Sequence, residues 1–345
     1  MRIYMMFDIT NIETTYSGGG KHRDDKVPNK VPNKTLKDEV AGSLIPDNIS
    51  ECSLARALSP GFMQTSTCVT DGMASHIYKA TRTNDMPSAK AALGCENERC
   101  VLGKLERELE KELGSGSVRR EISRCLKIPG PTDNRLLTNV DIDMTMQQWA
   151  AHNDKFYPYN FHMLNYASYS YRNGRVYNTP DTLVTIPFDA LYQGKLGRAY
   201  TCAGCIINSD TYQGDGVHWM ALFVDSRTNP ATAEFFNSSG NAPAPEWVNW
   251  MEKTKNIMMA LGLNATIVRA STLRHQKSKT ECGLYSLFYV WARMHGVPVR
   301  YFATNRIPDQ LMFEFRQHLF DDPTRPAMKK FDWDEYVATT KLSWE

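Results

Sequence analysis

One segment of this chain is apolar on nearly every side. It follows Cys282 and Gly283, reads LYSLFYVWARMHG, and stops at Gly296 with Pro298 just beyond. A surface helix carries a single apolar stripe, so a helix that is hydrophobic all round has to be buried. Glycine followed by proline is a common signal for the end of a helix. We therefore expect a core helix here, surrounded by other elements, with Cys282 at its N-terminal end.

Several short strand-like runs precede this segment. They are LVTIPF (183–188), AGCIIN (203–208), HWMALFVD (218–225), TAEFFN (232–237) and ATIVRA (265–270). Two helices are also expected, one capped by Thr138 or Asn139 and running through Trp149, and one from Glu246 to Leu261. Strands in series, rather than strands alternating with helices, are typical of an α+β fold. The sequence therefore predicts that class.

A rigid break at Pro129-Gly130-Pro131 separates two parts of the chain. Before it, leucines at steps of three and four residues indicate an amphipathic helix over 102–113, and a second short helix is expected from Ser117 through Cys125. Farther upstream, KVPNKVPNK places prolines where apolar residues are sparse. We divide the chain into a flexible or poorly defined N-terminal arm (1–88), a small helical N-terminal domain (89–128), a main domain (129–320) and a C-terminal extension (321–345).

Charge and hydropathy exclude two classes of partner. The formal net charge of +2 is far from the basic balance that phosphate-backbone binding usually needs, so no nucleic-acid partner is expected. No run of eighteen apolar residues occurs, and the opening MRIYMMFDI is too short and wrongly flanked for a secretory signal. We expect a soluble, unexported protein with no membrane partner. Nothing in the sequence sets the oligomeric state.

The chain contains eight cysteines. A protein of 345 residues can bury a sizeable core without disulfides, and nothing directs this one to an oxidising compartment, so we expect reduced thiols. Cys202 and Cys205 form a CxxC pair, which can be half of a zinc site, but no second pair follows at zinc-finger spacing. We interpret the pair as small residues on a strand, and we expect no metal and no cofactor.

Cys282 meets two conditions for a reactive thiol. The thiolate is the nucleophilic form of cysteine, and the unpaired N–H groups and dipole at a helix N-terminus favour an anion. A base is also needed, and His218 opens the run HWMALFVD. Asn237 closes the next run, so antiparallel pairing would bring it near His218, where it could orient the imidazole. Gln276 could donate its side-chain amide to an oxyanion, together with the backbone N–H of Cys282.

Each of these signals is weak alone. A single cysteine before glycine is more often a small buried residue, and a single His-Trp pair more often packs or binds a carbonyl. His275 is a rival base because it is closer to Cys282 in the sequence, and we interpret it as structural or substrate-facing. The ordered combination of a strand-opening His-Trp, a strand-end Asn, a Gln and a Cys-Gly before an apolar helix indicates a cysteine peptidase.

The same combination, including Gln-x5-Cys-Gly, resembles the SUMO-protease and adenovirus-protease superfamily. Within it, the similarity is greatest to the viral branch that processes polyproteins, that of African swine fever virus and its relatives. The resemblance covers roughly 95–320. It rests on CENERCV (95–101), PGPTDNRLLTNVDIDMTMQQWA (129–150), GCIINSD (204–210), HWMALFVD (218–225), EFFNSSGNAP (234–243), LRHQKSKTECGLYSLFYVWAR (273–293) and FRQHLF (315–320).

The resemblance implies a papain-like core, in which a central mixed sheet is flanked by helices and the nucleophile begins a buried helix. It implies His218 as the base, Asn237 as the residue that orients it, Gln276 as the oxyanion donor and Cys282 as the nucleophile. SUMO proteases carry Asp where this chain has Asn237. A neutral amide can still orient an imidazole but adds no negative charge.

The resemblance also implies a substrate. Cleavage is expected after Gly-Gly, in a narrow channel with Trp219 as one wall and Gly283 beside the nucleophile. In SUMO proteases a second Trp forms the opposing wall, at a position that corresponds to Leu136 here. The implied function is an endopeptidase that cuts viral structural polyproteins at Gly-Gly-Xaa during virion maturation, in the host cytoplasm at the viral factory and in the virion. The alternatives are an isopeptidase that removes SUMO or a similar modifier, and a catalytically inactive binding module.

Overall fold

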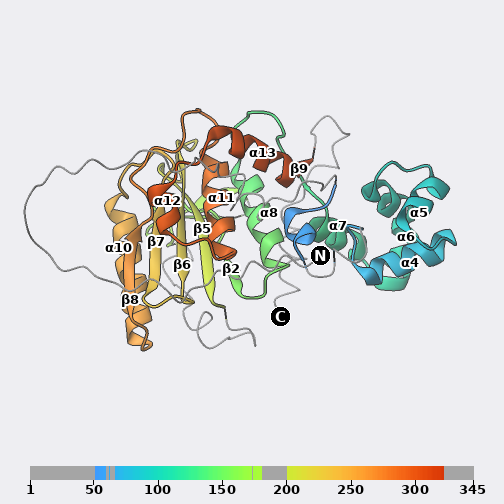
Figure 1. Ribbon diagram of the computed structural model, residues 1–345, viewed down its shortest axis with the longest axis horizontal. Helices are drawn as coiled ribbons and strands as arrows, with labels where there is room; N and C mark the ends of the chain where they lie inside the picture. Colours follow the sequence, from blue (N-terminus) through green and yellow to red (C-terminus); the bar gives the residue numbers. More distant parts are fainter. Residues whose placement is uncertain (1–50, 60–61, 63–66, 173, 181–199, 322–345) are drawn as a thin grey trace, which may run out of the picture. The chain divides into compact units, whose positions relative to one another are not determined.

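The computed structural model describes residues 51–59, 62, 67–172, 174–180 and 200–321. Its centre is a five-stranded mixed sheet (Figure 1) with the strand order β2-β5-β6-β7-β8. The strands are β2 (Phe156–Pro158), β5 (Cys202–Asn208), β6 (Trp219–Asp225), β7 (Ala231–Phe236) and β8 (Ala265–Arg269). The three middle strands are antiparallel, whereas each edge strand runs parallel to its neighbour. Four of the five expected runs are therefore strands of this sheet, and 183–188 lies outside the described residues.

Helices cover both faces of the sheet, which is why the middle strands are buried along their whole length. The covering helices are α8 (Asn139–Ala150), α10 (Pro245–Ala260) and α11 (Cys282–Met294). Ile206 and Phe223 belong to the apolar cluster that contains α11, whereas Ile207 and Leu222 belong to the cluster that contains α10. Because side chains alternate faces along a strand, α10 and α11 lie on opposite sides of the sheet (Figure 1). The predicted α+β fold is confirmed.

The core helix lies where the sequence predicts it. Every residue of α11 is buried, from Cys282 onward, and the chain turns away at Gly296 with a φ of 85°. Near its C-terminal end, Arg293 Nη2 lies 2.7 Å from Glu234 Oε1 and 2.9 Å from Asp225 Oδ2. A buried guanidinium is costly unless carboxylates compensate it. Since these two carboxylates belong to β7 and β6, Arg293 fixes α11 to the middle of the sheet.

The elements after α11 close the fold on the α11 side. They are α12 (Arg300–Thr304), α13 (Asp309–Leu319) and β9 (Phe320–Asp321). α13 packs on α11 through an edge-to-face contact between Phe288 and Phe315, with ring centroids 5.4 Å apart. β9 pairs in parallel with β1 (Ile128–Pro129), so the proline-rich break takes part in a second, two-stranded sheet.

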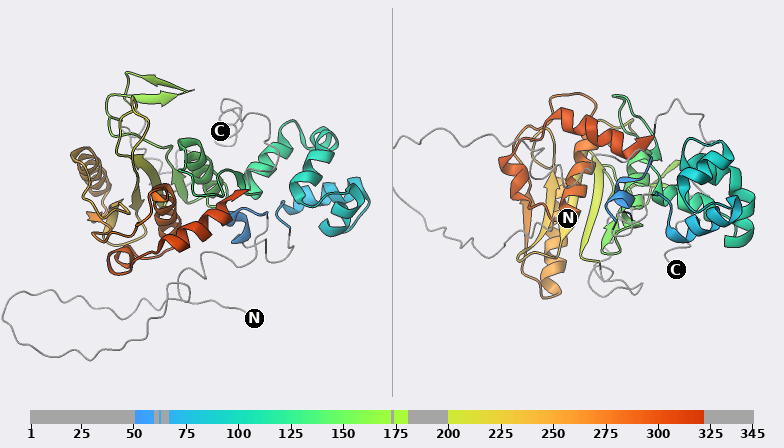
Figure 2. Two further views of the ribbon diagram at one scale, coloured as in Figure 1. Left: turned by 90° about the horizontal axis from the view of Figure 1, so that it is seen from above. Right: turned by 45° about the vertical axis from the view of Figure 1, so that its right-hand side comes forward.

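A hairpin stands apart from the central sheet, and the left view of Figure 2 shows it. It consists of β3 (Ser170–Arg172) and β4 (Arg175–Tyr177), which are antiparallel. The ring of Tyr171 meets Phe161 edge-on, with centroids 5.7 Å apart. No helix among the described residues is long and apolar enough to span a bilayer.

A group of helices precedes β1. They are α2 (Leu54–Ala57), α4 (Asp71–Thr81), α5 (Met86–Leu93), α6 (Glu98–Leu113) and α7 (Ser117–Cys125). The two helices expected around 102–113 and 117–125 are confirmed by α6 and α7. However, α2, α4 and the start of α5 lie inside 1–88, so the expectation of a flexible or poorly defined arm is wrong for this part. The sequence does contain a weak indication of α4: Thr70 is a typical N-cap residue, and the apolar residues Met73, Ala74 and Ile77 form the buried face of the helix.

Two disulfides correct the expectation of eight reduced thiols. Cys52 is bonded to Cys68, and Cys95 to Cys100. The free thiols are Cys125, Cys202, Cys205 and Cys282. The prediction was based on the size of the core that the whole chain can bury. The disulfides, however, occur in a region of short helices, where a cross-link stabilises by restricting the unfolded chain, as it does in small domains. Residues 1–50, including KVPNKVPNK, and 322–345 lie outside the described residues.

Candidate active site

Two of the predicted residues meet at one end of the sheet. His218 directly precedes β6, and Asn237 directly follows β7. The two strands are antiparallel neighbours with Ala221 opposite Phe236, so the start of β6 lies beside the end of β7. His218 Nε2 is 2.8 Å from Asn237 Oδ1. The strand pairing expected from the sequence therefore brings the imidazole and the amide together.

The other hydrogen bonds of Asn237 determine the tautomer of His218. Asn237 Oδ1 accepts bonds from the backbone N–H and the hydroxyl of Ser239, at 3.0 and 2.8 Å. Because an amide oxygen can only accept, Nε2 of His218 donates its hydrogen to it. The neutral imidazole then keeps Nδ1 unprotonated and able to take up a proton. Asn237 is buried and His218 is half-buried, so the imidazole is accessible while the group that orients it is shielded.

Cys282 is the first residue of α11 and is 3% exposed. Burial raises the pKa of its thiol, the backbone N–H groups of Trp219, Gly283 and Cys282 lower this pKa, and Glu281 raises it. The help expected from the helix N-terminus is present, but the cost of burial exceeds it. The thiol therefore needs a base to ionise. Trp219, whose N–H is among the groups that lower this pKa, is the first residue of β6 and directly follows His218.

Gln276 lies in the segment that leads to Cys282. Its Oε1 accepts a hydrogen bond from the Ser238 hydroxyl at 2.7 Å, and its Nε2 donates to the carbonyl oxygen of Ser278 at 3.0 Å. These bonds fix the orientation of a side chain that is 8% exposed. A side-chain amide carries two hydrogens, and the bond to Ser278 uses one of them.

His275 is held as a structural residue. It is buried, its Nδ1 accepts the N–H of Ile307 at 3.1 Å, and its Nε2 lies 2.9 Å from Ser271 Oγ. Since Nδ1 accepts, Nε2 carries the hydrogen and donates it to the serine. Burial lowers the pKa of His275 to about 4. Both ring nitrogens are thus engaged, and of the two interpretations left open by the sequence, the structure favours the structural one.

Cys282 lies at a groove of about 370 Å³, which Trp219 and Leu136 also line. The Trp219 indole donates its N–H to the carbonyl oxygen of Leu137 at 3.1 Å, which fixes the ring, whereas Leu136 is 55% exposed. A Cβ added to Gly283 would lie 3.2 Å from the Leu137 side chain and 3.3 Å from that of Trp219. Glycine therefore lets α11 approach this wall closely. The three residues expected to contact substrate are gathered around Cys282.

A second groove, of about 340 Å³, contains the imidazole. His218 and Asn237 line it, together with Ser239, Asn241 and Trp247 among others. Cys282 and Trp219 line the first groove, and His218 lines the second. Because His218 and Trp219 are consecutive in the chain, both grooves reach the start of β6.

Sequence reasoning missed the loop that precedes His218. Asn208 ends β5 and is 1% exposed, and its Oδ1 accepts the N–H groups of Asp210 and Val217, each at 3.0 Å. The Asp210 carboxylate in turn accepts the N–H of Gly216 at 3.0 Å. These bonds fold 209–217 into a wall of the thiol groove. Asn, Asp and Gly in NSDTYQGDG indicate turns, but the pattern alone does not show that the turns face Cys282.

Two other clusters contain residue types that bind metals. Cys202 and Cys205 project from opposite faces of β5, because they belong to the apolar clusters on its two sides. They cannot share one ion in this arrangement. The interpretation of the pair as strand residues is confirmed.

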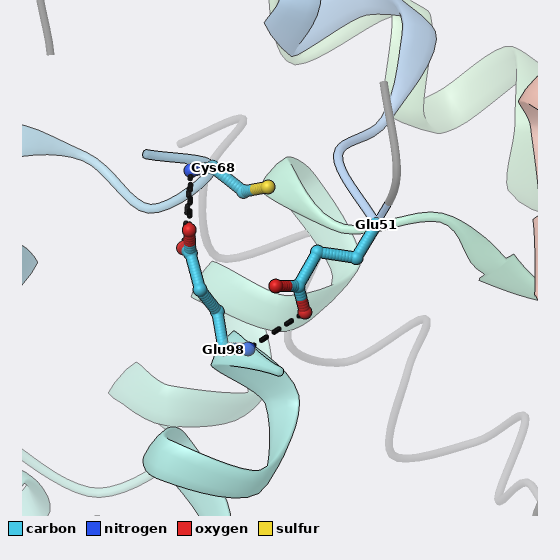
Figure 3. Close-up of side chains that lie close together, drawn as sticks. All are labelled: Glu51, Cys68 and Glu98. Atoms are coloured by element: carbon cyan, nitrogen blue, oxygen red, sulfur yellow. Dashed lines mark hydrogen bonds between the residues drawn. The ribbon is translucent and has the colours of Figure 1, made fainter. Parts of the chain in front are cut away.

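Glu51, Cys68 and Glu98 form the second cluster (Figure 3). The Glu98 carboxylate accepts the N–H of Cys68 at 3.0 Å, and the Glu51 carboxylate accepts the N–H of Glu98 and the Lys90 ammonium, each at 2.7 Å. The sulfur of Cys68 is bonded to Cys52. The two carboxylates are thus already bound to backbone amides and an ammonium, and the sulfur is in a disulfide. The cluster ties segments of the chain together and does not form an open metal site.

A cysteine at the N-terminus of a buried helix, a histidine at the start of a strand and an amide that orients it define a papain-like cysteine peptidase. Residues 205–327 match the Ulp1 protease family, C-terminal catalytic domain. The chain is 36% identical over 235 residues to a cysteine protease of African swine fever virus, isolate Tick/Malawi/Lil 20-1/1983, and the match covers 67% of this chain and 85% of that protein. The same values hold for a SUMO-1 cysteine protease of the isolate Tick/South Africa/Pretoriuskop Pr4/1996.

Comparison of structures agrees with comparison of sequences. The crystal structure of an African swine fever virus protease has a TM-score of 0.55 and 28% identity, and the alignment covers 79% of this chain and 96% of that one. The chain belongs to the Ulp1 family of cysteine proteases. It is a thiol protease of the SUMO-protease-like kind found in viruses, as its sequence predicts.

Proposed function

We propose that this protease is an endopeptidase that cleaves viral structural polyproteins after Gly-Gly during virion maturation. The observation that supports it most is the 2.8 Å bond between His218 Nε2 and Asn237 Oδ1. It lies at the end of the sheet where β6 begins with Trp219, and Trp219 and Cys282 line the same groove. This combination supplies a nucleophile, a base and an orienting group, which is what acyl transfer by a thiol needs.

The residues divide the reaction among them. His218 takes the thiol proton through Nδ1, and the thiolate of Cys282 attacks the carbonyl carbon of the scissile bond. The carbonyl oxygen becomes negative and is stabilised by the backbone N–H of Cys282 and the side-chain amide of Gln276. As the C–N bond breaks, His218 returns the proton to the leaving amine. A water molecule, deprotonated by the same imidazole, then hydrolyses the thioester and restores the thiol.

Specificity for glycine follows from the groove around Cys282. Two contacts hold the Trp219 ring: its indole N–H donates to the carbonyl of Leu137, and the ring meets Phe161 edge-on, with centroids 6.1 Å apart. In this proposal the substrate peptide passes between Trp219 and Leu136, which both line the groove of Cys282. A glycine backbone occupies the least space there, whereas a methyl group would displace the scissile carbonyl from Cys282.

Matched peptides test this specificity. Gly-Gly-Xaa substrates should be cleaved at least about tenfold faster than Gly-Ala-Xaa or Ala-Gly-Xaa, because a misplacement of about 1 Å can cost on the order of a hundredfold in rate. Changes at Xaa should be tolerated. Trp219→Ala should slow the enzyme and reduce the difference between glycine and alanine peptides. Equal rates on all three peptides would rule out both the Gly-Gly specificity and the role of Trp219.

A second candidate is an isopeptidase that removes SUMO, since one similar viral protein is named a SUMO-1 cysteine protease. An isopeptidase needs a broad surface for the folded modifier, whereas an endopeptidase needs only an extended peptide. We expect the ratio kcat/KM to be similar for a short Gly-Gly-Xaa peptide and for a SUMO fusion with the same junction. A strong preference for the fusion would favour the isopeptidase.

The same proposal assigns the enzyme to the host cytoplasm, at the viral factory, and to the virion. Its partner is then the polyprotein, and nucleic acid has no part. Immunoblotting of purified particles and of cytoplasmic fractions tests this assignment. Absence of the protein from both fractions would contradict it.

A further inference from the structure

A buried ion pair lies directly behind the proposed nucleophile. Glu281, the residue before Cys282, is 5% exposed, and Arg316 of α13 is fully buried. Arg316 Nη2 lies 3.6 Å from Glu281 Oε1. The guanidinium also donates from Nη1 to the carbonyl oxygen of Pro131 at 3.3 Å. A residue of α13, far along the chain from the sheet, thus contacts the turn that carries the thiol.

Glu281 stands where a negative charge opposes catalysis. It is the N-cap residue of α11, and its side chain makes no capping bond there. Its negative charge nevertheless lies next to the helix end whose dipole would favour a thiolate. A carboxylate beside a thiol disfavours ionisation of that thiol. Arg316 supplies a compensating positive charge from the protein interior, where charges are only weakly screened.

The contact acts through charge more than through directed bonding. Among the described residues, Nε and Nη2 of Arg316 have no hydrogen-bond partner, although both atoms are buried. The Glu281 carboxylate instead accepts the hydroxyl of Thr280 at 2.8 Å. Removing the positive charge of Arg316 would therefore break no hydrogen bond to Glu281 but would leave its carboxylate uncompensated.

We infer that Arg316 and Glu281 form a neutral pair that sets how readily Cys282 ionises. Arg316 is then a positioning residue for the reaction, since it touches neither the thiol nor the substrate groove. The inference rests on the proposed role of Cys282 as nucleophile. It extends that role by naming the charges that tune the thiol.

Other charged groups also surround the pair. Burial lowers the pKa of Arg316, and Glu281, Asp133 and Asp141 raise it, while Arg135 lowers it. From α13, the Asp309 carboxylate accepts the hydroxyl of Tyr285 in α11 at 2.8 Å and the N–H of Ser278 at 3.0 Å. His218 faces the thiol from the start of β6 in the proposed mechanism. Of these groups, Glu281 is the acid that acts on the Cys282 thiol most directly.

Opposite effects in single variants and their cancellation in the double variant test the inference. The measurement is the pH dependence of alkylation of Cys282 by iodoacetamide, followed by mass spectrometry of its peptide. Arg316→Met should move the midpoint to higher pH by about one unit, which is about tenfold slower alkylation below the midpoint. Glu281→Gln should move the midpoint to lower pH. The double variant should return close to the wild-type midpoint, and the acid limb of kcat/KM should follow the same order.

Other outcomes would overturn the inference. If both single variants shift the midpoint in the same direction, or if the double variant is no closer to wild type than Arg316→Met, the pair only packs. If Arg316→Met does not fold, Glu281→Gln decides alone, because it keeps the size of the side chain: an unmoved or raised midpoint contradicts the inference. Alkylation does not require peptide cleavage, so this test remains valid even if the Gly-Gly or polyprotein proposals fail. A wild-type Cys282 that is not alkylated would instead contradict the role of Cys282 as nucleophile.

Discussion

The central sheet and the helical region before β1 hold their buried charges in different ways. In the sheet, the Arg293 guanidinium pairs with two carboxylates, those of Asp225 and Glu234. In the helical region, the Glu98 carboxylate accepts backbone N–H groups of the segment around Cys68. Burial raises the pKa of Glu98 in spite of these bonds. The first arrangement joins two strands and a helix, whereas the second fastens one loop to one helix.

The two regions also differ in what stabilises them. The sheet is covered by helices on both faces, so apolar burial continues from one element to the next. The helical region adds two disulfides and the pair of Lys90 with Glu51 to its apolar contacts. We therefore expect single changes at the active site to alter rate and leave stability unchanged. Single changes in the helical region should alter stability first.

The largest expected effect is the loss of the nucleophile or the base. Cys282→Ser and His218→Ala should each reduce kcat/KM by at least about a thousandfold, because neither a hydroxyl nor an unassisted thiol is sufficiently ionised. The unfolding midpoint of each variant should match that of the wild type. As a control, iodoacetamide should label Cys282 before Cys202, whose pKa burial raises to about 12. If Cys202 is labelled first and activity survives, the nucleophile is not Cys282.

Removal of the disulfide that closes the longer loop tests the stability of the helical region. The bond between Cys52 and Cys68 closes 16 residues, so the double serine variant should lose about 3 kcal/mol of stability. The matched control is the double serine variant of Cys95 and Cys100. The disulfide that it removes closes only 5 residues, so this variant should lose about 2 kcal/mol of stability. Hydrogen exchange should accelerate in α4 to α6 and stay unchanged in β5 to β7. Equal acceleration in both regions would show that they unfold as one unit.

Loss of the orienting amide should cost less. Asn237→Ala should lower kcat/KM by about tenfold to a hundredfold, since a freely rotating imidazole spends less time aimed at the thiol. Asn237→Asp should keep measurable activity, because a carboxylate accepts the same ring N–H. Ser239→Ala is the matched control: it removes one of the other bonds to Asn237 Oδ1 and should cost less than either. A folded Asn237→Asp protein with no activity would contradict the orienting role.

The sequence was most informative where the pattern of apolar residues and the residues that end an element agree. The core helix from Cys282 was predictable because its residues are apolar on all sides and Gly296 stops it, and β5 to β7 were predictable as short apolar runs. The helix α4 was missed because its buried face rests on a few residues of a largely polar segment. The disulfides could not be predicted, since cysteine spacing does not reveal which sulfurs the fold brings together.

The candidate site divides in the same way. His218 and Asn237 could be placed together from strand pairing alone, because a hairpin register carries one strand's start to the next strand's end. The contact of Arg316 with Glu281 joins positions far apart in the sequence, and no local pattern indicates it. The loop held by Asn208 is a similar case. Its turn residues were visible, but the groove that they face is a product of the tertiary fold.

The smallest effect on rate is expected at His275, the histidine that stays outside the mechanism. His275→Gln should keep kcat/KM within about twofold of wild type, because the proposed base is His218 and general-base catalysis requires hydrogen-bond reach. Glutamine offers both an acceptor and a donor for the bonds to Ile307 and Ser271. A loss of activity as large as that of His218→Ala would reverse the assignment of the two histidines.

The same variant should change how stability depends on pH. Burial lowers the pKa of His275 from 6.5 to about 4, so this histidine binds a proton more readily in the unfolded chain. Its contribution to the free energy of unfolding is therefore present above pH 6.5 and is lost as the pH falls toward 4. Burial lowers the pKa of His152 to about 4 in the same way, so His275→Gln should reduce the slope without abolishing it. Urea unfolding of both proteins at pH 7.5 and at pH 5 measures the difference. An unchanged slope would mean that His275 binds a proton equally readily in the folded and the unfolded chain, and the argument that burial excludes it as a base would fail.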